Sequence, residues 1–203
     1  MSGAPEPIQA LVDRFDRDAF DMPHGRARVR LRVKGSDRCW DLEVQTKRHR
    51  FIEARNGAEP DTEITADEAS WRRAAGDLQG GMDAFRAGRL MIRKNLHLGV
   101  GFLSATSGKQ GPEALRFATV KTKLGRVSTM SAGAGPRTIV MLHGLGATKA
   151  EFLPTVAAMA PNGWRIVALD LPGFGDTDKP FPGAYDAPFF ARWVLATMDA
   201  MNI

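Results

Sequence analysis

Two glycine-rich segments carry the residues of this chain that are best suited to chemistry. The first is His143-Gly144-Leu145-Gly146, and the second runs from Asp170 to Gly175 as Asp-Leu-Pro-Gly-Phe-Gly. A glycine-rich loop after a strand lets a backbone amide come close to a substrate, because glycine has no Cβ in the way. Such an N–H stabilises the negative charge that develops on a carbonyl oxygen during acyl transfer. His143 and Asp170 also have the side chains of a general base and its acidic partner.

The flanking segments predict how these loops are positioned. Each loop follows an apolar run that predicts a buried strand, at residues 138–142 and 165–169, and the stretch 149–160 between them has the length of a helix. Strand, loop, helix, strand is a right-handed parallel unit. Its loops meet at the C-terminal ends of the strands, where open α/β sheets bind ligands. Residues 115–122 and 126–131 predict two preceding strands.

The order and spacing of these motifs resemble the first half of an α/β-hydrolase. The resemblance implies a partly parallel sheet with helices on both faces, and an oxyanion-hole donor in the backbone N–H of Leu145. In that family the histidine of the first loop supports the loop, and the base lies near the C-terminus. The resemblance therefore assigns loop support to His143, Gly144 and Gly146, and a structural turn to Asp170, Gly173 and Gly175.

No serine of the chain fits the nucleophile of that family. The nucleophile stands in a Gly-x-Ser-x-Gly elbow after the next strand. The nearest match is Ser131, but Thr129 replaces the first glycine and the segment precedes Asp170. The chain ends at Ile203, where the next strand is expected, so we predict a truncated and inactive hydrolase half over residues 115–203. Strand 138–142 would then have an unpaired edge, which predicts self-association.

The N-terminal half contains a strongly basic strand with a period of two. Arginines occupy positions 26, 28, 30 and 32, alternating with apolar residues. After Gly35-Ser36-Asp37, residues 41–45 alternate acidic and apolar side chains, which predicts a hairpin with arginines opposite carboxylates. We favour this solvated ladder over the alternative, a phosphate-binding face. No aromatic residues separate the arginines, so base stacking is not indicated.

Two sequence segments of the N-terminal half carry a second family resemblance. Ile64-Thr65-Ala66-Asp67 leads into a helix in a capping-box pattern with Thr65 as the cap, and the stretch Gly81–Ile92 reads Gly-Met-Asp-Ala-Phe-Arg-Ala-Gly-Arg-Leu-Met-Ile. With the order of elements, these resemble the sterol carrier protein 2 family over residues 5–107. The resemblance implies an α+β domain with a hydrophobic tunnel for an acyl or sterol chain. Its candidate lipid-binding residues are Phe85, Met91, Leu98 and Phe102; the alternative is that each of them only fills the hydrophobic core. His97 is expected to be a surface or capping residue.

Composition narrows the class of protein. The chain has 203 residues, 43% hydrophobic and 25% charged, with a net charge of +5 and one cysteine, Cys39. These values are typical of a folded protein without an internal disulfide. With no signal peptide or membrane-spanning run, we expect a cytoplasmic protein, and the arginine-rich, alanine-rich composition hints at a bacterial source. We expect no cofactor, no metal site and no nucleic-acid partner.

The fold class predicted is thus an α+β sterol-carrier-like domain at residues 1–107, a linker at 108–114, and an incomplete α/β-hydrolase at 115–203. The favoured function is a piece of a serine-type hydrolase of an ester or related bond that carries a lipid-binding domain. The alternative is a non-catalytic lipid-binding or transfer protein whose hydrolase half is vestigial or is completed by a partner. An apolar acyl or sterol-like molecule is the expected ligand in either case.

Overall fold

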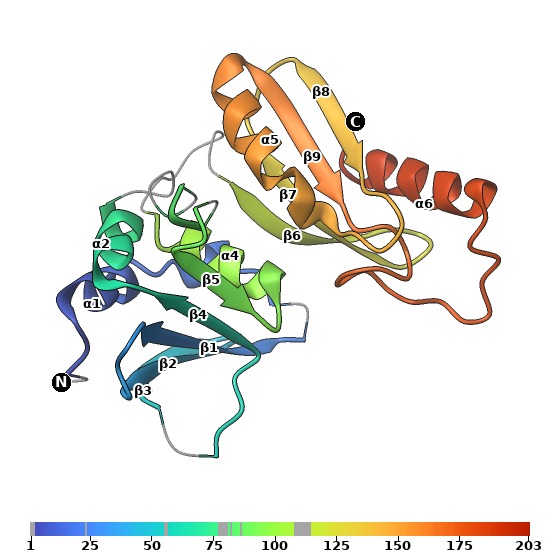
Figure 1. The fold of residues 1–203 in the computed structure, drawn as a ribbon. Helices are drawn as coiled ribbons and strands as arrows, with labels where there is room; N and C mark the ends of the chain where they lie inside the picture. The colour runs from blue at the N-terminus through green and yellow to red at the C-terminus, as the bar shows by residue number, and fades with distance from the viewer. Residues whose placement is uncertain are drawn as a thin grey trace. The chain divides into compact units, whose positions relative to one another are not determined.

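The structure is a computed structural model that describes residues 3–22, 24–54, 57–76, 81, 83–85, 87–107 and 115–203. It divides into two compact units, residues 1–109 (unit 1) and 110–203 (unit 2), drawn in Figure 1. The linker predicted at 108–114 lies outside the described residues, as do Met82 and Arg86 of the stretch Gly81–Ile92. Each unit is described by itself.

Unit 1 is built on a five-stranded mixed sheet. Its strands are β1 (Arg26–Val33), β2 (Cys39–Gln45), β3 (Arg48–Glu53), β4 (Thr62–Ala66) and β5 (Leu90–Arg93), in the order β3-β2-β1-β4-β5. The pair β1–β4 is parallel and the other pairs are antiparallel. Together with the helices on its apolar face, this sheet confirms the predicted α+β class.

The predicted pairing of arginines with carboxylates across β1 and β2 is also confirmed, but the Arg30–Asp41 pair is mostly buried rather than solvated, with side chains 13% and 1% exposed. Arg28 lies opposite Glu43 and Arg30 opposite Asp41 in the β1–β2 register. Arg28 donates to Glu43 at 2.9 Å, and Arg30 forms a two-pronged pair with Asp41 at 2.8 and 2.9 Å. A hydrogen bond from Arg50, with the charges of Arg50 and Arg28, lowers the pKa of Glu43. Most of the basic strand is therefore neutralised within the sheet.

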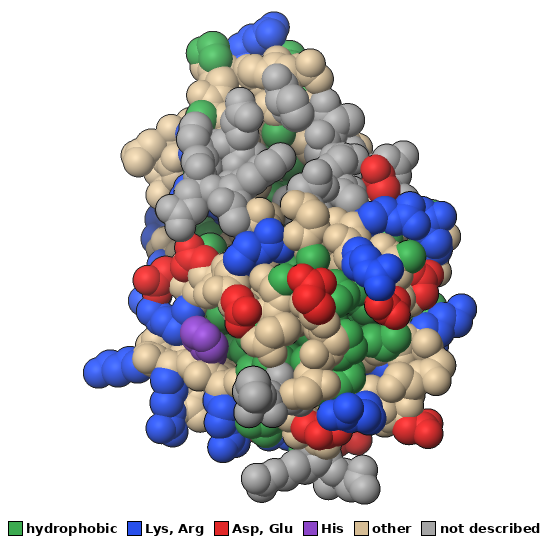
Figure 2. Space-filling view, turned by 90° about the vertical axis from the view of Figure 1, so that its left-hand side faces the viewer, with side chains coloured by type: hydrophobic (Ala, Val, Ile, Leu, Met, Phe, Trp, Pro, Cys, Tyr) green, Lys and Arg blue, Asp and Glu red, His purple; other side chains and the backbone are tan. Residues whose placement is uncertain are grey.

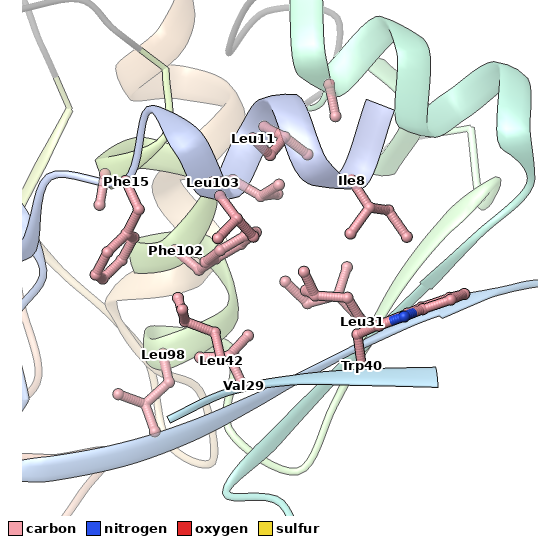
Figure 3. Close-up of a cluster of buried hydrophobic side chains, with 14 of the residues drawn as sticks. Ile8, Leu11, Phe15, Val29, Leu31, Trp40, Leu42, Leu98, Phe102 and Leu103 are labelled. Atoms are coloured by element: carbon pink, nitrogen blue, oxygen red, sulfur yellow. The ribbon is translucent and has the colours of Figure 1, made fainter. Parts of the chain in front are cut away.

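Among the described residues, the other, apolar face of the sheet is covered by α1 (Glu6–Asp13), α2 (Glu68–Gly76) and α4 (Leu96–Ala105), with a 3₁₀ turn, η1, at Arg17–Ala19. Figure 3 shows Leu98 and Phe102 of α4 among the apolar side chains of β1, β2 and α1. Phe15 stacks on Phe102 with ring centroids 6.1 Å apart. Burial of these side chains holds the helices on the sheet, because each large apolar side chain removed from water contributes roughly 1.5–3 kcal/mol.

Two local predictions in unit 1 were wrong. Thr65 does not cap α2, because it belongs to β4; Asp67 is the cap and accepts from the Ser70 N–H at 2.7 Å. This bond, with the Ser70 side chain, lowers the pKa of Asp67. His97 is neither a surface nor a capping residue, because Asn95 caps α4. It is buried, with Nε2 3.1 Å from Asp21 Oδ2.

Unit 2 contains a four-stranded sheet in the order β6-β7-β9-β8. The strands are β6 (Arg116–Lys121), β7 (Arg126–Ala132), β8 (Arg137–Leu142) and β9 (Trp164–Leu169). Between β8 and β9 the chain forms η2 (Lys149–Phe152), α5 (Leu153–Met159) and η3 (Ala160–Asn162), and α6 (Ala187–Ala200) follows β9 after a long loop. The β8–β9 pair is parallel and the other pairs are antiparallel. Helix α5 packs on β7 and β9, while Trp193 of α6 packs on Val127 and Leu169.

Strand β8 lies at the edge of this sheet. In the described part of the chain its neighbour in the sheet is β9, and its other edge is free. The prediction of an unpaired edge at this strand is therefore confirmed. Its last residue, Leu142, is 48% exposed. Free backbone donors and acceptors beside exposed apolar side chains can pair with another strand.

The molecular surface mixes charge with exposed apolar side chains. Figure 2 shows basic and acidic side chains interspersed over one face, with hydrophobic side chains between them. None of the helices among the described residues combines the length and the hydrophobicity that a membrane span requires.

Candidate functional site

The two glycine-rich loops of unit 2 lie side by side because β8 and β9 are parallel neighbours. Leu142, the last residue of β8, pairs with Leu169, the last residue of β9. The loop His143–Gly146 (the first loop) and the loop Asp170–Gly175 (the second loop) therefore leave the same edge of the sheet. This is the arrangement that the order of motifs predicts.

Both ring nitrogens of His143 are used to connect the loops. Nε2 accepts a hydrogen bond from the Leu171 N–H at 3.0 Å, so the ring proton lies on Nδ1. Nδ1 in turn donates to the Gly144 carbonyl oxygen at 2.8 Å. The ring is buried and meets Phe174 edge to face, with centroids 5.3 Å apart. With both nitrogens occupied by backbone groups, this imidazole is placed to support the loops and has no free nitrogen for a substrate proton.

The first loop turns sharply around Leu145. The Ala147 N–H donates to the Gly144 carbonyl at 3.2 Å, closing a four-residue turn, and Gly146 has φ +77°. A positive φ at the third turn residue is typical of a type II turn and favours glycine. The Leu145 side chain is 96% exposed. Among the described residues none accepts a hydrogen bond from the Leu145 N–H, so this donor is available to a ligand.

Asp170 holds the second loop to the segment after the first. It is fully buried, and its Oδ1 accepts from the Lys149 backbone N–H at 2.7 Å. Its Oδ2 accepts from the Lys149 ammonium at 2.7 Å and from the Asp176 N–H at 3.1 Å. Lys149 is buried as well. The carboxylate is thus saturated by structural donors and is not oriented toward a histidine.

Lys149 is the residue of this site that sequence reasoning missed. The sequence predicts only that residue 149 begins a helix-length stretch. The available signal was a lysine at the start of a segment whose following residues are mostly apolar, which is an unusual place for a buried cation. The identity of its partner depends on the β8–β9 pairing, which brings residue 149 next to residue 170.

The second loop is also fixed to β7. Thr177 donates to the Asp170 carbonyl oxygen at 2.7 Å and accepts from the Ser128 N–H at 2.9 Å. Asp178 accepts from the Arg126 N–H at 2.8 Å and from its guanidinium at 2.9 and 3.1 Å. The backbone hydrogen bond, followed by the bond and charge of the guanidinium, lowers the pKa of Asp178.

Gly175 is required by the close approach of the loop to Asp170. A Cβ at this position would lie 2.0 Å from Asp170 Oδ2, and the residue has φ +48°. Both the space and the backbone conformation therefore exclude a larger residue. Gly173, with φ +91°, lies against the Tyr185 ring, 2.5 Å from where its Cβ would be.

Three of the four candidate lipid-binding residues of unit 1, Phe85, Leu98 and Phe102, belong to one apolar cluster, and Met91 does not. Leu98 and Phe102 lie in the filled core, and Phe85 is half-buried against it. Met91 is 37% exposed and pairs with Thr65, while its neighbours Leu90 and Ile92 face the core. The alternation of side chains along β5 therefore places Met91 on the outer face of the sheet. Ile92 is the β5 residue that joins Phe85 at the apolar cluster.

The described residues hold no group of three His, Cys, Asp or Glu side chains arranged to bind a metal ion. The sequence contains no Gly-x-Ser-x-Gly elbow. Within the described part of unit 2, the site therefore offers a backbone donor held by the hydrogen bonds of His143 and Asp170.

Comparison with known families agrees with both halves of this description. Residues 16–105 match the SCP-2 sterol transfer family, and residues 137–203 match part of the α/β hydrolase fold family. The mixed sheets with their helices belong to these two folds, and both resemblances seen in the sequence are thereby confirmed.

Individual relatives match the hydrolase part. The chain is 29% identical over 92 residues to epoxide hydrolase 1 from Siraitia grosvenorii, covering 45% of this chain and 29% of the relative. It is 34% identical over 94 residues to 2-hydroxy-6-oxononadienedioate/2-hydroxy-6-oxononatrienedioate hydrolase from Cupriavidus pinatubonensis, covering 43% and 32%. An epoxide hydrolase structure from Vigna radiata matches with a TM-score of 0.42 and 24% identity over 47% of this chain and 31% of that one. The chain thus spans less than a third of the length of these relatives.

Proposed function

We propose that unit 1 binds an apolar acyl or sterol-like molecule and that unit 2 supplies one side of the oxyanion hole of a hydrolase. The proposal starts from the matches of residues 16–105 to the SCP-2 sterol transfer family and of residues 137–203 to part of the α/β hydrolase fold. The parent reaction is hydrolysis of an ester or related bond by a serine nucleophile. The 203 residues alone bind the ligand and do not turn it over.

One observation carries the hydrolase part of this proposal. Among the described residues none accepts a hydrogen bond from the Leu145 N–H, which lies on an exposed turn between segments that are hydrogen-bonded to the second loop. His143 joins the first loop to Leu171, and Asp170 joins the second loop to Lys149. An oxyanion donor stabilises a transition state when it is preorganised, because no energy is then spent on orienting it during the reaction.

Absence of turnover follows from the residues that the sequence lacks. A tetrahedral intermediate forms only after a nucleophile attacks, and the second oxyanion donor of this fold is the backbone N–H that follows the nucleophile. Neither group is present without the elbow. His143 cannot replace the missing base while Nε2 accepts from Leu171. The oxyanion side of a site without its attacking group gives little catalysis.

The lipid-binding role of unit 1 is supported by the family match and by the apolar cluster between β5, α4 and the residues before β5. Leu98 is a buried member of this cluster, and Phe85 and Ile92 are partly buried residues packed against it. A chain entering there would meet apolar side chains from three segments. The burial of apolar surface provides the binding energy, at roughly 25 cal/mol per Å².

The free edge of β8 favours one alternative function. A non-catalytic lipid-binding protein whose unit 2 pairs with another strand would use the same edge that the hydrolase fold leaves open here. In this alternative the partner completes the sheet and the chain itself serves as a carrier. Pairing through β8 would change the oligomeric state, whereas acyl binding would be unchanged.

A fluorescent fatty acid and a nitrophenyl ester distinguish these possibilities with the full chain. We expect saturable binding of the fatty acid, weakened by Phe85→Ala and unchanged by the matched control Met91→Ala on the opposite face of the sheet. We expect no nitrophenol release and no mass increase after treatment with a serine-directed phosphonate. Ester turnover abolished by the phosphonate would contradict the assignment of the catalytic nucleophile outside these residues. Equal loss in both variants would contradict the proposed ligand position.

A further inference from the structure

The ladder on the outer face of the unit 1 sheet consists of rows of cross-strand neighbours, and its inner rows contain carboxylates. In one row Arg28 and Arg50 flank Glu43, which accepts hydrogen bonds from both at 2.9 and 2.6 Å. In the next row Arg30 lies opposite Asp41 and forms a two-pronged pair with it. Each of these arginines therefore has an acidic partner within the sheet.

The first row of the ladder has no carboxylate. Arg26, Gln45 and Arg48 are neighbours across β1, β2 and β3, and we refer to these three residues as the Arg26 row. Glutamine stands where the following rows have glutamate and aspartate. Arg48 Nε donates to Gln45 Oε1 at 3.1 Å, so the amide oxygen is occupied and the amide nitrogen adds a further donor. No described carboxylate pairs with Arg26. The row therefore presents hydrogen-bond donors and two positive charges.

The surface around the Arg26 row is hollowed and held in place. Two adjoining recesses, with volumes of about 450 and 470 Å³, share Arg26 and Gln45 in their walls. The first also has Glu43, Glu59 and Asp61 in its wall, whereas the described lining of the second contains no carboxylate, so the second recess is the one suited to an anion. Lys47 lines the second recess and adds another exposed cation. Thr46 ties the β2–β3 turn to the start of β1 through a hydrogen bond from its hydroxyl to the Gly25 carbonyl at 3.3 Å. The positions of the cations are thus set by the sheet and its turn.

We propose that the Arg26 row docks unit 1 on the phosphate headgroups of an anionic phospholipid membrane. The proposal rests on the proposed lipid-binding function, because a carrier of this kind must meet the membrane that holds its ligand. The planar fork of arginine matches phosphate oxygens and forms charge-assisted hydrogen bonds with them. The row is exposed, and Arg26, Arg48 and Lys47 all line the second recess, which brings three exposed cations to one part of the surface. A membrane surface offers headgroups to all three cations at once, and each basic residue near an anionic leaflet contributes about 1 kcal/mol to binding.

Vesicle co-sedimentation of the full chain tests the proposal. The vesicles contain phosphatidylcholine alone, which is neutral overall, or phosphatidylcholine with about 30% phosphatidylglycerol, which gives the surface a negative potential. The variants are R26Q/R48Q and Q45E, which supplies the carboxylate missing from the row. The matched control is R72Q/R73Q, which removes the same charge from α2 on the other face of the sheet. Fluorescent fatty acid binding is measured in parallel for every variant.

We expect binding only to the anionic vesicles. We expect R26Q/R48Q to weaken it about 30-fold, because each basic residue near an anionic surface contributes about 1 kcal/mol. Q45E should weaken binding to a similar extent, whereas R72Q/R73Q should retain at least half of the wild-type affinity. Equal loss in all three variants, or equal binding to neutral vesicles, would overturn the proposal. Saturable binding of inorganic phosphate that R26Q/R48Q abolishes, with no binding to anionic vesicles, would overturn the proposal in favour of a soluble phosphate. Vesicle binding that follows this pattern in a chain unable to bind the fatty acid would support the docking site and contradict the carrier function.

Discussion

Replacing Lys149 by methionine perturbs the buried pair that connects the two loops of unit 2. The ammonium of Lys149 and the carboxylate of Asp170 are 2.7 Å apart, and both side chains are almost completely buried. Methionine keeps most of the side-chain volume and removes the charge. The carboxylate then retains its hydrogen bonds from the Lys149 and Asp176 N–H groups but has no cation.

The expected loss of stability is about 3 kcal/mol for Lys149→Met and about 4 kcal/mol for Asp170→Asn, within the range for breaking one partner of a buried pair. The larger value applies to Asp170→Asn because the amide nitrogen would face a buried ammonium that has only Asp176, at 4.0 Å, as a remaining acidic neighbour. The double variant should lose less than the sum of the two, by at least about 1 kcal/mol, because the residues are in direct contact.

Hydrogen exchange measured by mass spectrometry provides the assay, because it assigns the loss to peptides of unit 2 and leaves unit 1 as an internal reference. Lys121→Met is the matched control: the same substitution at an exposed lysine on β6 should change stability by no more than about 0.5 kcal/mol. A loss for Lys149→Met as small as that of Lys121→Met would refute the reasoning. Additive losses in the double variant would also refute it.

Three further changes follow from the same loops and from the edge of the sheet. Asp178→Asn should make the stability of unit 2 fall less steeply in acid, because the bonds to Arg126 lower the pKa of Asp178 in the folded chain. The contribution of Asp178 to stability is complete above its unfolded pKa of about 4 and is lost as the pH falls through its folded pKa. Urea titrations between pH 2 and 7 would detect the difference. Gly175→Ala should destabilise unit 2 by more than 2 kcal/mol, an order-of-magnitude value for strain plus a clash with Asp170; a melting temperature equal to that of the wild type would contradict the close approach. Thr138→Lys on β8 should reduce self-association in sedimentation velocity, because charge on an edge strand discourages pairing; unchanged association would show that copies meet elsewhere.

Much of the fold could be predicted from local patterns. Alternation of arginines with apolar residues along Arg26–Val33 indicates a strand with one basic face, and the acidic alternation at residues 41–45 indicates its partner. The structure has this register. The parallel unit of β8, α5 and β9 follows in the same way from two apolar runs and their glycine-rich endings. Patterns of this kind are local, so a single sequence contains them.

The long-range partners could not be predicted in this way. The Lys149–Asp170 pair depends on which loops the sheet brings together, and no spacing in the sequence specifies it. The burial of His97 depends on packing around α4, whose residues are apolar on nearly all sides. Met91 is different, because the period-two alternation of side chains along β5 predicts that Met91 faces away from the core. The same alternation predicts that Ile92 faces the core, which makes Ile92 the better candidate for contact with a bound lipid.

The measurement that tests the central account most directly is displacement of a bound fluorescent fatty acid from the full chain by the palmitate ester of 4-methylumbelliferone. The ester competes for the acyl site and releases a fluorescent product if it is hydrolysed. The account predicts saturable displacement with no product release, because the ligand-binding unit is present and the nucleophile is absent. Release of the product, or the absence of any displacement, would contradict it.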